Sequence, residues 1–428
     1  MFERLFKLSE HGTNVRTEIV AGITTFLTMS YIIFVNPDIL SSTGMDRDAV
    51  FVATCLAAVI GTFIMAFVAN WPIGMAPGMG LNAFFAFTVV GAMGFSWQQA
   101  LGAVFISGVI FIILTVTGVR TWIVDGIPRS LRSAIAAGIG MFLGIIALTS
   151  SGIVVDHPAT NITLGDLTSH QALYAILGFF IIAALDALKV RGAILIGILV
   201  VTISSIFTGH TNFQGVVSMP PSLAPTFMQL DIMGALSMGL AHVILVLVLV
   251  EIFDATGTMI GVAKRANLME EGKPNRLGRA LFADSTAIVA GSVIGTSSTT
   301  AYVESASGVQ AGGRTGLTAL TIGVLFLLAL FFSPLAGVVP SYATAPALLY
   351  VAGLMLREIT EVEWSDVTEA TPAALTALAM PFTYSIANGL AFGFISYAVL
   401  KIATGRFREL HPATIIVAIL FVIKYAIQ

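Results

Sequence analysis

Apolar residues fill this chain in long runs, and most charged residues lie in the short stretches between them. Runs of about 16 to 25 apolar residues recur from Glu18 to the last residue, and most are long enough to cross a hydrocarbon core of about 30 Å. The pattern predicts an all-α polytopic membrane protein with about 14 transmembrane segments. The predicted spans cover about residues 18–38, 49–70, 77–90, 97–118, 132–150, 171–188, 192–207, 233–258, 281–295, 302–312, 315–335, 340–356, 371–388 and 389–404. A further apolar run at about 412–427 exceeds this count.

Composition supports the same class of protein. Of 428 residues, 57% are hydrophobic and only 10% are charged, whereas soluble domains carry about 25% charged residues. The mean hydropathy is +0.95, so water is not the main solvent. A net charge of −3 gives no indication of nucleic acid binding, and the single cysteine, Cys55, excludes an internal disulfide and a cysteine-based metal cluster. We therefore expect no cofactor and no metal site.

Basic residues predict the orientation in a cell inner or plasma membrane. No cleavage pattern follows the N-terminal charges, so the first span is expected to stay in the protein. If the N-terminus is cytoplasmic, the basic clusters fall on the cytoplasmic side, as the positive-inside rule requires. These clusters are Arg4/Lys7/Arg16, Arg120/Arg129/Arg132, Lys189/Arg191, Lys264/Arg265/Lys273/Arg276/Arg279, Arg314, Arg357 and Lys401/Arg406/Arg408. Only Arg47 is clearly outside, and the side of Lys424 depends on how the last helix is placed.

The third and tenth spans are short, and both begin in sequence that disfavours a regular lipid-facing helix. The third follows the Gly- and Pro-rich stretch 71–80, and the tenth follows the Ser- and Thr-rich stretch 295–300. Non-helical backbone at membrane depth is tolerated only where protein or a water-filled cavity surrounds it. We therefore expect both segments to be buried inside the protein.

These two spans hold corresponding places in an internal repeat. Each is third in a set of seven spans, and each set has a proline, Pro128 or Pro340, before its fifth span. A repeat with seven crossings must place its second copy in the opposite orientation. Interrupted segments at corresponding positions of two inverted halves indicate a binding site near the midplane of the membrane.

Four acids inside predicted spans are candidates for chemistry: Glu251, Asp254, Asp284 and Glu304. An acid at the centre of a membrane helix costs roughly 2.5–3.5 kcal/mol, which argues for a use. Glu251 and Asp254 are three residues apart and share one helical face. If Asp254 and Glu304 meet across a dry cavity, one of them can hold an exchangeable proton near neutral pH, which suits proton coupling. Both could also accept hydrogen bonds from N–H groups of a planar heterocycle.

Structural explanations stand beside these functional ones. Glu251 could bond a neighbouring hydroxyl, Glu304 could cap free N–H groups where its helix begins, and Asp284 could be a helix cap or a salt-bridge partner. Asn82 could reach the cavity from the opposite repeat, whereas Gly80 would allow close backbone packing.

Four stretches of the sequence carry a family likeness: Ala21–Tyr31, Ala76–Phe85, Phe253–Thr258 and Gly295–Ser305. They resemble the nucleobase:cation symporters related to uracil and xanthine permeases, and more closely the AzgA-like adenine/guanine/hypoxanthine permeases. The likeness runs nearly end to end. It implies two inverted seven-span repeats, in which the third and tenth spans are short strand-then-helix elements, arranged as a core domain and a gate domain.

The same resemblance implies the division of the chain into domains. Residues 1–120 (spans one to four) and 233–336 (spans eight to eleven) would form the core. Residues 121–232 (spans five to seven) and 337–428 (spans twelve to fourteen) would form the gate, through which a homodimer would assemble.

The resemblance also implies roles for individual residues. Asp254 and Glu304 match the eighth- and tenth-span carboxylates, and Asn82 with Gly80 matches the third-span positions of purine-type members. The substrate-binding set is completed by candidates for ring contact and by one hydroxyl, namely Phe253, Phe84 and Ser305. Proton coupling falls to Glu304, Asp254 or Glu251.

Together these features predict a secondary transporter rather than an enzyme, taking up purine bases with protons by alternating access. Uracil or xanthine transport is one alternative. A transporter or channel for anions on a similar scaffold is another, but it would need basic residues or half-helix N-termini at the midplane. An intramembrane carboxylate protease needs two acids as general acid and base, but its sequence signature is missing. The residues do not rank the purines, and they leave sodium open as the coupling ion.

Overall fold

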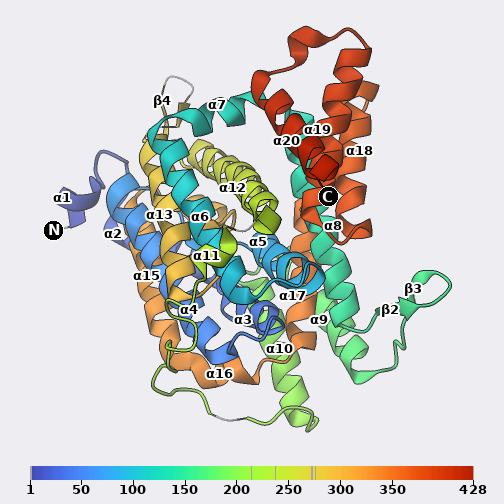
Figure 1. The fold of residues 1–428 in the computed structure, drawn as a ribbon. Coiled ribbons are helices and arrows are strands. Elements are labelled where there is room, and N and C mark those ends of the chain that lie inside the picture. Colours follow the sequence, from blue (N-terminus) through green and yellow to red (C-terminus); the bar gives the residue numbers. More distant parts are fainter. Residues whose placement is uncertain (1, 214, 237, 271–272, 275, 428) are drawn as a thin grey trace.

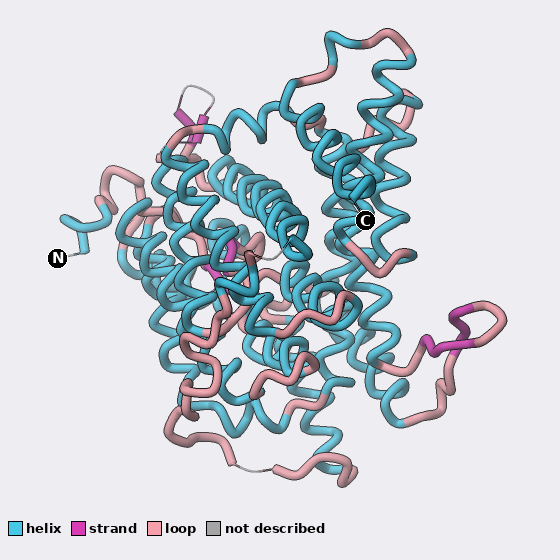
Figure 2. The backbone as a smooth tube through the Cα atoms, in the orientation of Figure 1, coloured by secondary structure: helices cyan, strands magenta, loops and turns pink. Residues whose placement is uncertain are grey.

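Helices make up most of the chain in the computed structural model, which describes residues 2–213, 215–236, 238–270, 273–274 and 276–427. In this part of the chain, strands form three short antiparallel pairs (Figures 1 and 2). The strands are β1 (Met75–Pro77), β2 (Val154–His157), β3 (Asn161–Leu164), β4 (Met269–Glu270), β5 (Lys273–Pro274) and β6 (Thr299–Ala301). They pair as β1–β6, β2–β3 and β4–β5.

The helices divide between the two halves of the chain. Those of the first half are α1 (Phe2–Phe6), α2 (Val15–Met29), α3 (Ile32–Ser41), α4 (Arg47–Ile64), α5 (Met79–Ala83), α6 (Trp97–Val116), α7 (Val119–Gly126), α8 (Arg129–Ser150), α9 (His170–Ala187) and α10 (Ala193–Phe207). Those of the second half are α11 (Ile232–Ala235), α12 (Met238–Arg265), α13 (Leu277–Ile294), α14 (Ser305–Gln310), α15 (Gly316–Ala329), α16 (Ser333–Val338), α17 (Ser341–Leu356), α18 (Val367–Phe382), α19 (Ile386–Ala403) and α20 (Pro412–Ile427). Two π-helical segments, η1 (Met65–Ala69) and η2 (Phe84–Ala92), and three 3-10 turns, η3 (Leu330–Phe332), η4 (Arg357–Glu361) and η5 (Phe407–Glu409), extend or link them.

The chain is a multi-pass membrane protein. Within the described residues, nine helical segments are long and apolar enough to cross a membrane. They are Val15–Ser41, Arg47–Ala69, Trp97–Val116, Arg129–Ser150, His170–Ala187, Ala241–Arg265, Leu277–Ile294, Gly316–Val338 and Ile386–Ala403. Shorter apolar helices cover Met79–Ala92, Ala193–Phe207 and Pro412–Ala426, so the extra run at the C-terminus is helical as well.

Several predicted boundaries shift for local reasons. Asp231 caps a separate short helix, α11, by accepting the N–H of Gly234 at 2.8 Å, so the eighth span begins later than predicted. Near the C-terminus the predicted border between spans at 388 and 389 is wrong. Ser385 caps α19 instead, and α18 ends at Phe382. The first span is broken between α2 and α3 at Ser30 and Tyr31.

Two groups of helices pack mainly within themselves. In the first, α15 lies against α2 and α4, while α13 lies against α4 and α6, and α6 also contacts α12. In the second, α8 packs against α17 and α18, α18 packs against α19, and α9 packs against α10 and α17. Figure 1 shows the second group on the right, with α8, α18 and α19 beside one another.

A buried carboxylate joins α2 to the start of α15 inside the first group. Glu18, fully buried on α2, accepts hydrogen bonds from the backbone N–H of Arg314 at 2.9 Å and of Thr318 at 3.2 Å. The Thr318 hydroxyl donates to it at 2.6 Å. These donors surround the first turn of α15, so Glu18 satisfies N–H groups that a helix start leaves free.

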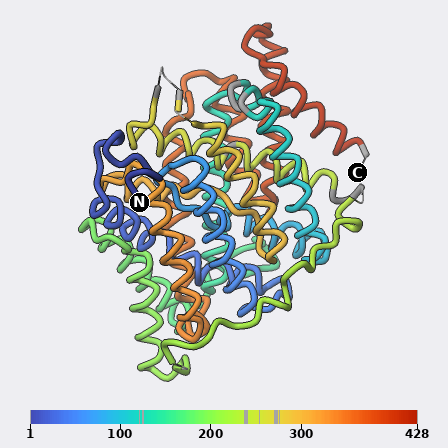
Figure 3. Tube along the Cα trace, turned by 90° about the vertical axis from the view of Figure 1, so that its left-hand side faces the viewer, coloured from blue at the N-terminus to red at the C-terminus, as the bar shows by residue number. Residues whose placement is uncertain are grey.

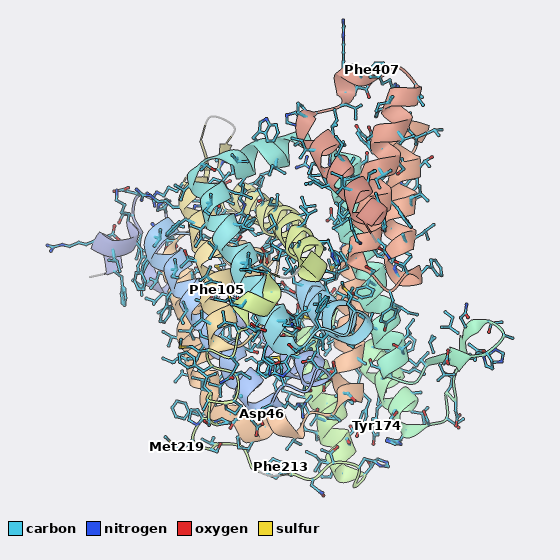
Figure 4. The ribbon with its side chains drawn as sticks, viewed as in Figure 1. Asp46, Phe105, Tyr174, Phe213, Met219 and Phe407 are labelled. Atoms are coloured by element: carbon cyan, nitrogen blue, oxygen red, sulfur yellow. The ribbon has the colours of Figure 1, made fainter. Side chains whose placement is uncertain are left out.

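Segments outside the helices mark the two ends of the molecule. The connection between α10 and α11 runs across the lower edge (Figures 1 and 3) and carries the exposed Phe213 and Met219. Figure 4 shows both residues, with Asp46, at the end opposite Phe407. The β4–β5 pair lies at the same end as Phe407 (Figure 1). The β2–β3 pair, which the apolar pattern did not predict, projects from between α8 and α9.

Candidate functional site

The two interrupted spans meet at a pair of buried strands. β1 precedes α5, β6 precedes α14, and the strands run antiparallel with Met75 opposite Ala301 and Pro77 opposite Thr299. Backbone bonds extend the pairing on both sides, from Gly78 N–H to Ser298 O at 2.9 Å and from Tyr302 N–H to Gly74 O at 3.0 Å. The predicted strand-then-helix form of both spans is confirmed. The pairing supplies the hydrogen bonds that buried backbone needs in a membrane.

Neighbouring side chains satisfy the outer edge of β1. Thr62 of α4 accepts the N–H of Met75 at 2.9 Å and donates to its carbonyl at 3.2 Å. Ser305, a predicted substrate contact, accepts the N–H of Gly74 at 3.0 Å through its hydroxyl oxygen. One lone pair of Ser305 is therefore occupied in holding the approach to β1.

Asp254 lies on α12 beside the start of α5. A Cβ atom at Gly78 would lie 3.9 Å from Asp254 Oδ2 and 2.8 Å from Thr300 Cγ2, so a side chain at Gly78 would intrude between β6 and this carboxylate. α12 also contacts β6 and α14, which flank Glu304. The structure thus brings the two predicted carboxylates together beside the strand pair.

Glu304 occupies the N-cap position of α14, but its side chain makes no capping bond. It accepts a hydrogen bond from the Tyr31 hydroxyl at 2.5 Å. Its backbone carbonyl accepts a second bond from Ser307 Oγ at 2.7 Å. The carboxylate is therefore held by a partner on the first span rather than used to start its own helix.

Glu251 makes the hydroxyl contact anticipated for it. Ser298 Oγ donates to Glu251 Oε1 at 2.6 Å, and Ser107 Oγ lies at 3.5 Å from the same atom. The other oxygen, Oε2, is buried and has no hydrogen-bond partner among the described residues.

Asn82 lies in α5 and is fully buried. Its side-chain oxygen accepts a hydrogen bond from Ser297, while its Nδ2 has no partner in the described part of the chain. Asn36 shows the converse: its Nδ2 donates to Thr54 at 2.7 Å and Thr296 at 2.9 Å, and its Oδ1 is unpaired within those residues. Unpaired buried donors and acceptors are costly unless a ligand or water completes them.

The remaining predicted site residues lie around this centre. A Cβ at Gly80 would lie 2.6 Å from Ile139 Cγ2 of α8, so Gly80 allows α5 to touch the second helix group. Phe84 is fully buried in η2. The side chain of Phe253 lies outside the described part of the structure.

Asp284 is a salt-bridge partner, as one of its predicted explanations held. Arg120 Nη2 lies 3.0 Å from Asp284 Oδ2, both side chains are buried, and the Arg120 guanidinium lies 3.8 Å from the centre of the Phe111 ring. Sequence analysis had counted Arg120 among the cytoplasmic residues. Because Arg120 forms this internal ion pair, its position gives no information on the orientation of the chain in the membrane.

Sequence reasoning missed Tyr31, Tyr302 and Asn36 as members of the site. The Tyr302 hydroxyl donates to Pro77 O at 2.6 Å and thereby ties β6 back to β1. The available signal was the spacing of polar residues in the first span, where Thr28 and Tyr31 share one face. Neutral polar residues were given too little weight beside the acids.

Known proteins that are similar to this chain show its family. The sequence model of a permease family, Xan_ur_permease, matches residues 16–423. The chain belongs to this permease family. Adenine permease AdeP of Escherichia coli is 52% identical to this permease over 425 residues, which cover 99% of this chain and 96% of AdeP. Guanine/hypoxanthine permease PbuO of Bacillus subtilis is 46% identical over 428 residues, covering 98% and 99% of the two chains.

A solved structure resembles the permease in fold. The transmembrane domain of the cyanobacterial bicarbonate transporter BicA matches with a TM-score of 0.64 and 16% sequence identity, covering 89% of this permease and 97% of that domain. At this identity the likeness concerns the fold alone. Family membership and fold together make this chain a membrane transporter.

Proposed function

We propose that this permease takes up purine nucleobases by proton-coupled alternating access. The names of its relatives, which include an adenine permease and guanine/hypoxanthine permeases, support the substrate class. The observation that carries the proposal is the placement of two partly buried carboxylates, Asp254 and Glu304, at the crossing of the interrupted spans, where the Asn82 amide N–H₂ has no partner among the described residues. A purine presents ring N–H donors and ring nitrogen acceptors, which complement this set.

Each site residue has a role in this proposal. Asp254 and Glu304 accept N–H groups of the base, and Asn82 donates to a ring nitrogen. Phe84 and Phe253 are proposed to line the ring, while Gly80 and Ser305 shape the cavity. The coupling proton resides on Glu304, Asp254 or Glu251, because these acids lie around the strand pair. Their negative charge must be neutralised when the core carries the site through the membrane.

The helix groups correspond to a moving core and a gate. We propose fourteen spans in two inverted repeats, with residues 1–120 and 233–336 as the core and residues 121–232 and 337–428 as the gate. The internal packing of the two groups and the antiparallel β1–β6 pair support this division. Substrate would then be exposed alternately to either side as the core moves against the gate. A homodimer through gate helices is part of the proposal, and the particle mass in detergent tests it.

The orientation in the membrane is proposed from the basic clusters of the sequence. We propose a cell inner or plasma membrane with the N-terminus in the cytoplasm, so that Phe407 faces the cytoplasm and Met219 faces outward. Both are exposed, at 61% and 80%, whereas the native Cys55 is buried. A membrane-impermeant maleimide applied to intact cells should therefore label Met219→Cys and spare Phe407→Cys. The reverse labelling would overturn the orientation.

Anion transport is the rival function on a similar fold. It would need basic residues or half-helix N-termini at the midplane, and the starts of α5 and α14 supply such N-termini beside the strand pair. The buried cation near that region, Arg120, is paired with Asp284 at 3.0 Å. The acids at the crossing favour a neutral base with N–H groups over an anion.

Uptake measurements test the proposal directly. Labelled adenine, hypoxanthine, guanine and uracil are offered to cells without their own base permeases, with and without a protonophore and with and without sodium. Saturable purine uptake that collapses with the proton gradient is expected. Asp254→Asn and Glu304→Gln should abolish it, while the exposed-site controls Asp156→Asn and Glu10→Gln should not. Wild-type-like purine uptake by both site variants would refute the assigned roles, and bicarbonate or chloride flux without any base uptake would refute the substrate class.

A further inference from the structure

We propose that Tyr31 is a positioning residue for Glu304, an inference that rests on the proposed function. The Tyr31 hydroxyl donates to Glu304 Oε1 at 2.5 Å, and the tyrosine is 1% exposed. It lies at the break between α2 and α3, 273 residues away from Glu304 along the chain. A residue on the first repeat thus fixes the orientation of a substrate-binding carboxylate on the second.

Close packing keeps the two partners at bonding distance. The face of α2 that leads to Tyr31 lies directly on α14, because a Cβ at Gly308 would lie 2.1 Å from Thr25 Oγ1 and 2.6 Å from Ala21 O. Thr28 Oγ1 lies 3.0 Å from Ser307 Oγ, one turn before Tyr31. The bond between Tyr31 and Glu304 therefore rests on a close contact between α2 and α14, which holds the two side chains within reach of each other.

The bond from Tyr31 gives the two oxygens of the Glu304 carboxylate different roles. An ionised carboxylate has about four acceptor positions on two oxygens. With Oε1 engaged by Tyr31, Oε2 is left to receive an N–H of the base. A site held in its productive geometry before substrate arrives spends less binding energy on ordering it.

The neighbouring tyrosine does not duplicate this role. The ring centres of Tyr31 and Tyr302 are 6.5 Å apart, but the Tyr302 hydroxyl is committed to Pro77 O at 2.6 Å. Loss of the Tyr31 hydroxyl therefore leaves Glu304 Oε1 without that donor.

The test variant is Tyr31→Phe, which keeps the ring in place and removes only the hydroxyl. We expect the KM for purine uptake to rise by about 10- to 100-fold, as for loss of a hydrogen bond to a charged group. Vmax per transporter is expected to stay within about twofold, because the conformational change that moves the base across the membrane does not use this bond. The matched control is Tyr342→Phe on α17: its hydroxyl is also buried and bonded at 2.5 Å, but to Ser205. Its KM should match wild type.

A double variant separates positioning from packing. If Tyr31 acts through Glu304, adding Tyr31→Phe to Glu304→Gln should not weaken adenine binding further, as measured by calorimetry on purified protein. An unchanged KM in Tyr31→Phe, an equal rise in Tyr342→Phe, or additive losses in the double variant would each overturn the inference. The proposed function survives those results provided that wild type takes up purines and Glu304→Gln does not. Absence of purine uptake in wild type overturns both.

Discussion

The buried ion pair between Arg120 and Asp284 offers a quantitative test of the fold. Both side chains are almost completely shielded, with exposed fractions of 1% and 0%, and the guanidinium also donates to Leu281 O at 3.2 Å. Arg120→Met removes the positive partner and leaves a buried carboxylate without its ion pair. Breaking a buried pair from one side costs about 3–5 kcal/mol, because the remaining charge is uncompensated.

The cost converts into a change of melting temperature. Unfolding entropy of about 2.1 cal/mol/K per residue makes 1 kcal/mol worth roughly 1 °C for a chain of this length that unfolds as one unit. Arg120→Met should therefore lower Tm in detergent by at least about 3 °C. Residual helix in the unfolded state reduces the entropy and enlarges the shift.

Two further variants make the result specific. Arg129→Met breaks the exposed pair with Glu361, in which the side chains are 73% and 45% accessible, and should change the free energy of unfolding by no more than about 1 kcal/mol. Replacing both buried partners, as Arg120→Met with Asp284→Leu, should recover most of the stability. The reasoning is wrong if the Tm of Arg120→Met equals that of Arg129→Met, or if the Tm of the double variant is no higher than that of Arg120→Met.

Three other outcomes follow from the described contacts. Glu18→Gln should destabilise the protein by at least about 1.5–3 kcal/mol, since an amide N–H₂ replaces an acceptor of several hydrogen bonds, and a lowered Tm checks it. Gly308→Ala should cost about 1–3 kcal/mol through overpacking, and Thr25→Ala in the same chain should recover part of the lost Tm, as Oγ1 is the nearest obstacle. Arg406 holds the pKa of Asp366 below its usual range by donating to it, so the stabilising bond is complete above the ordinary pKa of about 3.9 and lost only at lower pH. Asp366→Asn should then lower Tm equally at about pH 7 and about pH 5, and a loss confined to pH 7 would contradict this.

Much of the architecture could be predicted from the sequence because hydrophobic length and breakers have direct physical meanings in a membrane. The apolar runs predicted most helices, and the glycine, proline and serine clusters located both interrupted spans. Boundaries failed where a single polar side chain decides them, as Ser385 does for α19. In the sequence, Ser385 is one serine among many small residues, so no pattern marked it as the cap.

The site was predicted unevenly, and the reason lies in how each residue is recognised. A carboxylate in an apolar run is conspicuous, so Asp254, Glu304 and Glu251 stood out. The contact of Tyr31 with Glu304 joins positions 273 residues apart, and no local pattern encodes such a distance. Arg120 misled for the opposite reason: basic residues near span ends normally face water, and only the fold reveals the acid that draws this one inside.

The β1–β6 pair joins the two interrupted spans through main-chain atoms, so the joint tolerates changes of side chain. Hydrogen bonds between Ala76 and Thr300, for example, depend on backbone register and not on which side chains stand there. Substitutions on either strand can therefore accumulate without loosening the joint. One interrupted span can then carry an amide, Asn82, and the other an acid, Glu304, so two similar backbone elements bring different chemistry to one place.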